Sequence, residues 1–242
     1  MDIKNKTILI TGANRGIGRA LLEEALKTGA KRVYAGTREP FAHSDKRVVL
    51  LTLDVTNETQ ILRAVGSVES LDILVNNAGV DLHDDLNDRA GIDRHLAVNL
   101  FGTHAVTQAF LPLLARSQGS IVNVLSLGAL ASVPFSPAYA ISKAAAFSMT
   151  QALRALWAGR GVEVHAVFPG PVDTDLTRSL DIPKASAESV ARAILDGMER
   201  EEEDIFPDPM SENIADGWRS GAAKALERQF AAYMPESVAK SS

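Results

Sequence analysis

A tyrosine and a lysine spaced four residues apart offer the clearest chemistry in this sequence. Tyr139 and Lys143 lie in segment 136–143, whose pattern predicts the start of a helix. An i,i+4 spacing places both side chains on one helix face. A free phenol has a pKa of about 10 and exchanges protons poorly near neutrality, but a neighbouring ammonium lowers that pKa. The pair therefore predicts an acid/base for carbonyl and alcohol chemistry. Taken alone, the same spacing also fits an ordinary surface pair.

The surrounding pattern predicts strands that alternate with helices. Apolar runs predict strands at 7–10, 32–36, 48–53, 72–75, 120–125 and 162–167, with a short edge strand at 205–206. Helical periodicity predicts helices at 16–27, 57–65, 92–114, 137–158, 186–198 and 211–234. Short apolar strands between helices indicate a parallel sheet buried on both faces. We expect one α/β domain over residues 1–242, with a Rossmann-type, doubly wound sheet of about seven strands.

Composition excludes several classes of function. The 242 residues carry a net charge of −5 without a basic block, so we expect no nucleic-acid partner. The absence of cysteine excludes disulfides and thiolate chemistry. The five histidines lack metal-site spacing, so we expect no metal. No apolar run is long enough to cross a membrane and no signal-peptide pattern is present, so we expect a cytoplasmic protein. We interpret the acidic run 199–204 as a solvated turn.

The first strand is followed by a glycine-rich turn, Gly12-Ala13-Asn14-Arg15-Gly16-Ile17-Gly18. Glycines let backbone amides approach a pyrophosphate, and the following helix directs its positive end at the anion. A strand, a glycine-rich turn and a helix in this order predict a dinucleotide site, although a plain tight turn has the same composition.

Residues at the end of the second strand favour NADP as the cofactor. An acidic residue there would bind the free ribose of NAD, but Thr37 occupies the position and Arg38 follows it. Arg38 and Arg15 would both bind a 2′-phosphate, so we expect NADPH rather than NADH. Two alternatives stay open: the arginines are solvated surface residues, or Glu39 binds the ribose.

With these motifs in place, the chain resembles the classical short-chain dehydrogenase/reductase family. The resemblance covers about residues 5–200, with 201–242 as an extension. Besides the glycine turn and the Tyr139–Lys143 pair, it rests on Asn76-Asn77-Ala78-Gly79 after the fourth strand, and on Asn99, Ser126 and Pro169-Gly170.

The resemblance implies a role for each of four catalytic residues. Tyr139 is the proton donor in reduction, and Lys143 lowers its pKa and binds the nicotinamide ribose. Ser126 binds the substrate carbonyl, and Asn99 holds a water that links Lys143 to solvent. Without the resemblance, Ser126 fits a turn or helix cap and Asn99 a buried polar residue. The implied cofactor contacts, besides Tyr139 and Lys143, are Gly12, Asn14, Arg15, Gly16, Ile17, Gly18, Thr37, Arg38, Asp54, Val55, Asn76, Ala78, Gly79, Pro169, Gly170, Val172 and Thr174.

The C-terminal part departs from the family pattern, in which many members end in a glycine-rich strand that builds a tetramer. We therefore expect a homodimer through the helices containing 101–114 and 144–156, with a homotetramer as the alternative. The apolar positions of 211–234 fit packing on the chain's own domain, on a partner subunit or at the substrate entrance.

Substrate-binding residues are expected in segments 127–135, 80–86 and 171–183. Their available side chains are mainly apolar and lack a cluster of cations, which favours a neutral ketone or aldehyde; they are Leu127, Leu130, Val133, Phe135, Pro171, Leu176 and Leu180.

The leading interpretation is an NADPH-dependent carbonyl reductase. An NAD(P)-dependent alcohol dehydrogenase, working in the oxidative direction, would use the same residues. A non-enzymatic NADPH-sensing protein is a third hypothesis, which the presence of all four catalytic residue types disfavours. A sugar epimerase would have a longer chain and different glycine spacing.

Overall fold

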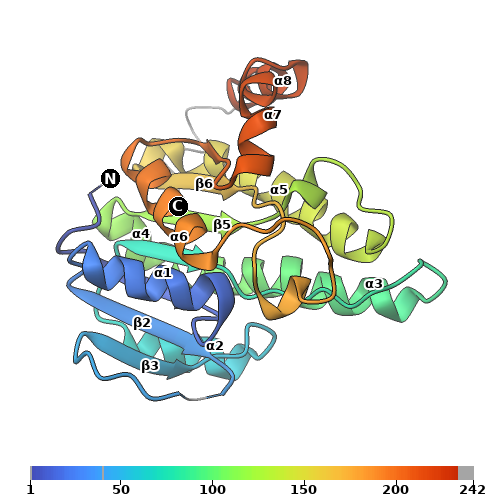
Figure 1. Ribbon diagram of the computed structural model, residues 1–242. Helices are drawn as coiled ribbons and strands as arrows, with labels where there is room; N and C mark the ends of the chain where they lie inside the picture. The colour runs from blue at the N-terminus through green and yellow to red at the C-terminus, as the bar shows by residue number, and fades with distance from the viewer. Residues whose placement is uncertain (1, 40, 234–242) are drawn as a thin grey trace.

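The computed structural model describes residues 2–39 and 41–233, so Met234, the last residue of the predicted tail helix, lies outside them. Within this part, seven strands form one parallel sheet in the order β3-β2-β1-β4-β5-β6-β7 (Figure 1). They are β1 (Thr7–Thr11), β2 (Arg32–Thr37), β3 (Val48–Thr52), β4 (Ile73–Asn76), β5 (Ser120–Val124), β6 (Glu163–Val167) and β7 (Asp204–Ile205). The prediction of a doubly wound parallel sheet is confirmed.

The sheet order brings the sequence motifs to one edge. Parallel strands end at the same edge, and the order reverses between β1 and β4, where open α/β sheets bind their ligands. Gly12 follows β1, Asn77 follows β4 and Ser126 lies just after β5. Chain segments that are far apart in sequence therefore meet at the carboxyl end of the sheet.

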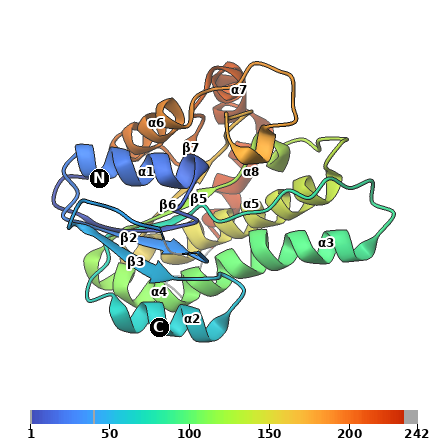
Figure 2. The ribbon, with the colours of Figure 1, turned by 60° about the horizontal axis from the view of Figure 1, so that its bottom comes forward.

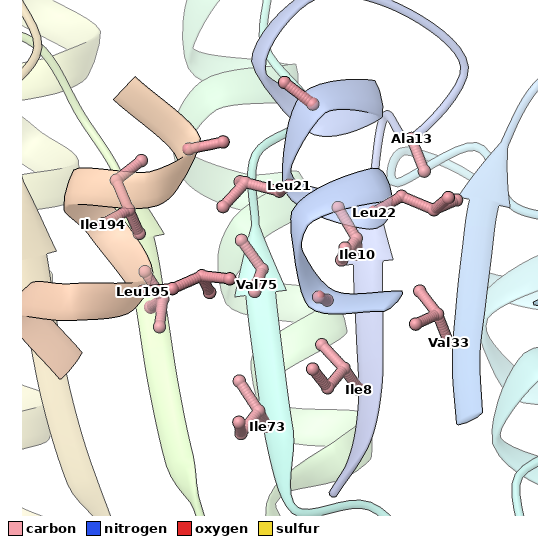
Figure 3. Packing of buried hydrophobic residues seen from close by; sticks show 14 of the residues in the cluster. Ile8, Ile10, Ala13, Leu21, Leu22, Val33, Ile73, Val75, Ile194 and Leu195 are labelled. Atoms are coloured by element: carbon pink, nitrogen blue, oxygen red, sulfur yellow. The ribbon is translucent and has the colours of Figure 1, made fainter. Parts of the chain in front are cut away.

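One face of the sheet is covered by α1 (Gly16–Lys27) and α6 (Ala187–Glu199), as Figure 2 shows. Figure 3 shows apolar side chains of β1 and β4 packing against both helices. The labelled residues include Ile8, Ile10, Val75, Leu21, Leu22, Ile194 and Leu195. Complete burial of one such side chain stabilises the fold by about 1.5–3 kcal/mol.

The opposite face is covered by α2 (Glu58–Ser67), α4 (Thr103–Ser117) and α5 (Pro137–Trp157). Phe110 and Leu114 of α4 are fully buried against the sheet. Proline at the first position of α5 suits a helix start, because its missing N–H has no helical partner there. Tyr139 is therefore fixed in the first turn of a 21-residue helix.

The predicted helical stretch 92–114 is present, but it is not α-helical throughout. The structure has α3 (Arg89–Leu96), a π-helical segment (Ala97–Gly102) and then α4. Gly102 packs so closely on Val55 that a Cβ there would lie 2.6 Å from Val55 Cγ2. The wider turn carries Asn99, whose side chain bonds both the N–H and the carbonyl of Val80, each at 2.9 Å.

The C-terminal part also differs from its prediction. The expected single helix over 211–234 is wrong, since α7 (Pro209–Arg219) and α8 (Ala222–Ala231) are separated at Ser220 and Gly221. Together they lie at the β6–β7 end of the sheet (Figure 1). Asp204, in the run interpreted as a solvated turn, is only 3% exposed. The described part of the chain also contains three short 3₁₀ turns, at Leu127–Ala129, Ala158–Arg160 and Asp175–Thr177.

Candidate active site

A cavity of about 520 Å³ opens at the carboxyl ends of the strands. Its walls come from the turns after β1, β2, β3, β4, β5 and β6 and from the first turn of α5. The cavity therefore lies at the sheet edge where the sequence motifs meet, and it is the candidate active site.

The glycine turn forms one end of the cavity. Gly12 has φ +68°, a conformation that L side chains rarely adopt, and a Cβ on Gly18 would lie 2.2 Å from the Gly12 carbonyl oxygen. Helix α1 begins at Gly16 without a side-chain cap and without an acidic residue in its first turn. Its first N–H groups are thus directed toward the cavity end, as an anionic phosphate requires.

Two arginines flank the end of β2 and the glycine turn. Arg15 Nη1 lies 3.0 Å from Asp175 Oδ2, in an exposed pair that joins the glycine turn to the segment after β6. Burial raises the pKa of Asp54, but hydrogen bonds from Thr56 and the charge of Arg38 outweigh it and hold that pKa below its ordinary value. The charge of Arg38 therefore acts on Asp54, and both residues line the cavity.

Ser126, Tyr139 and Lys143 lie together in the wall of the same cavity. Lys143 Nζ lies 5.7 Å from the centroid of the Tyr139 ring and donates a 2.8 Å hydrogen bond to the carbonyl of Val124. Ser126 Oγ also accepts the N–H of Gly128 at 3.0 Å, so this residue caps a 3₁₀ turn as well as facing the cavity.

The electrostatics of this group differ from the expectation that Lys143 lowers the pKa of Tyr139. Burial raises the pKa of Tyr139 above its ordinary value, a hydrogen bond with Ser126 lowers it, and the charge of Asp81 raises it. Burial lowers the pKa of Lys143 to about 8, and Asp81 opposes that change. The structure thus favours a protonated phenol beside a lysine that loses its charge in the mildly alkaline range.

Asn99 lies behind the cavity wall rather than in it. It is 2% exposed, and its amide donates a 2.9 Å hydrogen bond to Ser142 Oγ in addition to the two bonds with Val80. A Cβ added to Gly79 would lie 3.2 Å from Asn99 Oδ1 and 3.5 Å from Lys143 Nζ. Asn99 Oδ1 and Lys143 Nζ therefore both lie beside Gly79.

Most residues predicted for the site line the cavity, with Gly18, Asn76 and Asn99 as the exceptions. Gly18 is needed for the close helix contact described above. Asn76 is buried in the sheet, where its amide donates to Thr107 and Asn123. Its neighbour Asn77 takes the cavity position and binds the carbonyl oxygens of Thr11 and Gly12.

The substrate end of the cavity contains most of the predicted apolar side chains. Leu127, Val133, Phe135, Pro171, Leu176 and Leu180 line it. Leu130 instead packs against a buried cluster around Phe168. Ser136 and Met210 are among the lining residues outside the predicted segments, and Asp81 lies inside one without having been singled out. Asp81 lies within a segment expected to bind substrate, and that position is the sequence signal that identifies it.

In residues 2–39 and 41–233, no three His, Cys, Asp or Glu side chains are arranged to hold a metal ion. No helix in the same ranges is both long and apolar enough to cross a membrane.

Known proteins with similar sequences and structures point to one family. Residues 6–184 match the family model described as short chain dehydrogenase. The 2-(S)-hydroxypropyl-CoM dehydrogenase 3 of Xanthobacter autotrophicus is 37% identical over 189 residues, which cover 70% of this chain and 72% of that protein. Estradiol 17-beta-dehydrogenase 2 of Mus musculus is 34% identical over 230 residues, which cover 88% of this chain but 57% of the mouse protein. A solved short chain dehydrogenase from Burkholderia cenocepacia, in complex with NADP, has a TM-score of 0.84 and 35% identity, covering 95% of this chain and 99% of that one. The chain therefore belongs to the short-chain dehydrogenase/reductase family.

Proposed function

We propose that this protein is an NADPH-dependent carbonyl reductase that acts on apolar ketones or aldehydes. The observation that carries the proposal is the convergence of Ser126, Tyr139 and Lys143 in the wall of a cavity that also contains the glycine turn. When bound, NADPH supplies the hydride for the carbonyl carbon. The uncapped start of α1 and the glycine turn fit its pyrophosphate.

Four side chains have the other roles in the proposed reaction. The Tyr139 phenol donates a proton to the carbonyl oxygen, and the Ser126 hydroxyl stabilises the negative charge that develops there. Lys143 binds the nicotinamide ribose, and Asn99 orders the solvent path behind it.

The substitution Tyr139→Phe tests this assignment. Without the phenol, kcat for ketone reduction should fall by about 10²–10⁴-fold. The Kd for NADPH, measured by fluorescence titration, should change by less than about threefold, since neither glycine turn nor sheet is altered. Tyr233→Phe makes the same change at an exposed tyrosine and should leave both values intact. An active Tyr139→Phe enzyme would refute the assignment.

The preference for NADPH rests on Arg15 and Arg38, which both line the cavity. Two charge-assisted hydrogen bonds to a 2′-phosphate would favour NADPH by at least about 10-fold. The NADP complex of the Burkholderia relative supports this choice. In Arg38→Asp the ratio of Kd values for NADH and NADPH should reverse, because a carboxylate repels the phosphate and accepts the ribose hydroxyls. A wild-type preference for NADH, or an unchanged ratio of Kd values in Arg38→Asp, would contradict the choice of NADPH as the cofactor.

Three further parts of the proposal concern the whole protein. A homodimer through α4 and α5 is supported by exposed apolar side chains at Phe101, Ile141 and Leu156 on and beside these helices, with a homotetramer as the alternative. A single domain over residues 1–242 and a cytoplasmic location stay predictions.

A further inference from the structure

Asp81 places a carboxylate at the end of the cavity that contains Tyr139. Asp81, Ser126 and Tyr139 all line this cavity. The hydroxyl of Ser136, the residue just before α5, donates a hydrogen bond to Asp81 Oδ1. This contact fixes Asp81 beside the helical turn that carries the phenol.

Within the described ranges no lysine or arginine lies at ion-pair distance from Asp81, although its charge acts on Lys143 in the same cavity. His95 Nε2 lies 3.9 Å from Oδ1, but it accepts the Leu82 N–H at 2.9 Å. His95 Nδ1 lies 2.7 Å from the Gly91 carbonyl oxygen, to which it donates. An imidazole that accepts at one nitrogen and donates at the other is neutral. His95 therefore supplies no positive charge.

Asp81 also has unused capacity to accept hydrogen bonds. Its side chain is 13% exposed, and within residues 2–39 and 41–233 its Oδ2 accepts no hydrogen bond. A carboxylate offers about four acceptor positions. A ligand with a donor at this place would occupy one of these free positions.

The other carboxylates that line the cavity have different surroundings. They belong to Glu39, Asp54 and Asp175. Glu39 and Asp54 follow β2 and β3, and Asp175 pairs with Arg15 and Arg178. The influence of Asp81 on the pKa values of Tyr139 and Lys143 agrees with its place at the reacting end.

We infer that Asp81 is a specificity-determining residue that accepts a hydrogen bond from a hydroxyl or ammonium group on the carbonyl substrate. The inference rests on the proposed reductase function and narrows it: preferred substrates carry a hydrogen-bond donor beside the carbonyl, and anionic substrates are rejected. An apolar wall with one carboxylate attracts the first kind and repels the second.

The experiment measures kcat/KM with NADPH for four phenyl ketones that differ beside the carbonyl. They are acetophenone, 2-hydroxy-1-phenylethanone, 2-amino-1-phenylethanone and phenylglyoxylate. The wild type should prefer the hydroxy or the amino ketone over acetophenone by about 10-fold or more, since a hydrogen bond to a charged acceptor is worth that much. Comparing the hydroxy ketone with the amino ketone identifies which donor Asp81 binds. Phenylglyoxylate should be the poorest substrate.

Asp81→Asn removes the charge at nearly constant volume. It should reduce the advantage of the donor-bearing ketone by about 10-fold and raise kcat/KM for phenylglyoxylate by a similar factor. Asp85→Asn is the matched control, because Asp85 lies on the same segment but is exposed, is not among the residues that line the cavity, and bonds its neighbour Asn87. Asp85→Asn should leave the ratios of kcat/KM among the four ketones within about twofold of their wild-type values.

The wild-type ranking tests the inference even if Asp81→Asn fails to fold. Equal rates for acetophenone and both donor-bearing ketones, or unchanged ratios in a folded Asp81→Asn protein, would overturn the role of Asp81 while leaving the reductase function intact. Failure of every ketone to react, with NADPH still bound, would instead refute the reductase function and this inference with it.

Discussion

At the scale of one residue, Lys143 shows that a buried charge in the candidate active site destabilises the fold. Lys143 is 5% exposed, its ammonium bonds the Val124 carbonyl, and burial lowers its pKa to about 8 from the ordinary 10.5. A lysine whose folded-state pKa is lowered destabilises the fold wherever it is charged. The penalty is therefore complete below pH 8 and disappears as the pH rises toward 10.5.

Lys143→Met should make the protein more stable at pH 7 while abolishing reductase activity. We expect a gain of about 1–2 kcal/mol, after the lost hydrogen bond to Val124 is subtracted from the burial penalty. The gain should shrink between pH 8 and pH 10.5, where wild-type Lys143 loses its proton. Urea unfolding at several pH values measures it, with the exposed Lys27→Met as control. A variant less stable than wild type, by an amount independent of pH, would contradict this account.

At the scale of elements, one carboxylate joins α7 to the candidate active site. Asp208 Oδ1 accepts the N–H groups of Met210 and Ser211 and so caps the start of α7. Its Oδ2 accepts the N–H of Gly170 at 2.7 Å, in the segment after β6 that lines the cavity. Asp208 therefore connects the start of α7 to the predicted nicotinamide end of the cavity.

Asp208→Ala should loosen both connections. We expect a loss of about 2–3 kcal/mol, from the helix cap together with the buried Gly170 N–H left without its acceptor. KM for the carbonyl substrate should rise as well, since Met210 in the first turn of α7 lines the cavity. Urea unfolding and steady-state kinetics provide the two measurements.

Ser186→Ala is a suitable comparison because Ser186 caps α6 by accepting the Ser189 N–H at 3.0 Å. It should cost about 1 kcal/mol and leave KM unchanged. Equal effects of both substitutions on KM would show that the Asp208–Gly170 contact does not couple α7 to the site.

The same elements show how far sequence reasoning reaches. The strands follow from apolar runs, and the site residues follow those strands, so the sheet order alone brings Ser126 toward the glycine turn. The π-helical segment within 92–114 does not follow, because the apolar periodicity continues while this segment packs on Val55 and bonds Val80, which are distant in sequence. The Asp81–Ser136 contact spans 55 positions and has no local signal.

The break between α7 and α8 is a different kind of error. Apolar positions recur at helical spacing through 211–233, but Gly221 is a helix breaker that was present in the sequence. In the structure it is the N-cap residue just before α8, and α8 packs against α5. A glycine inside an otherwise periodic tail was the available signal.

At the scale of the whole molecule, a buried ionic cluster attaches α8 to the β7 end of the sheet. Lys224 Nζ, on α8, lies 2.8 Å from Asp204, 2.9 Å from Glu203 and 3.0 Å from Glu227. Arg154 of α5 contacts Asp204 at 2.9 Å and also pairs with Glu227. Lys224 is 2% exposed, so its removal would leave carboxylates buried with too few cations.

Lys224→Met should destabilise the protein by about 3 kcal/mol or more at neutral pH. The exposed pair of Lys27 and Glu24 offers a contrast, since Lys27→Met should cost less than about 1 kcal/mol. Thermal and urea unfolding of both variants provide the comparison.

The pH dependence of that difference identifies its electrostatic origin. Burial raises the pKa of Asp204, but Arg154, Lys224 and a hydrogen bond from Trp218 outweigh burial and hold the pKa below its ordinary value of 3.8. The contribution of Asp204 is thus complete above pH 3.8 and is lost as the pH falls through the lowered folded-state pKa. Wild type and Lys224→Met should therefore converge in stability under acidic conditions. A difference that persists unchanged there would mean that packing of the Lys224 stem, rather than its charge, attaches α8 to the sheet.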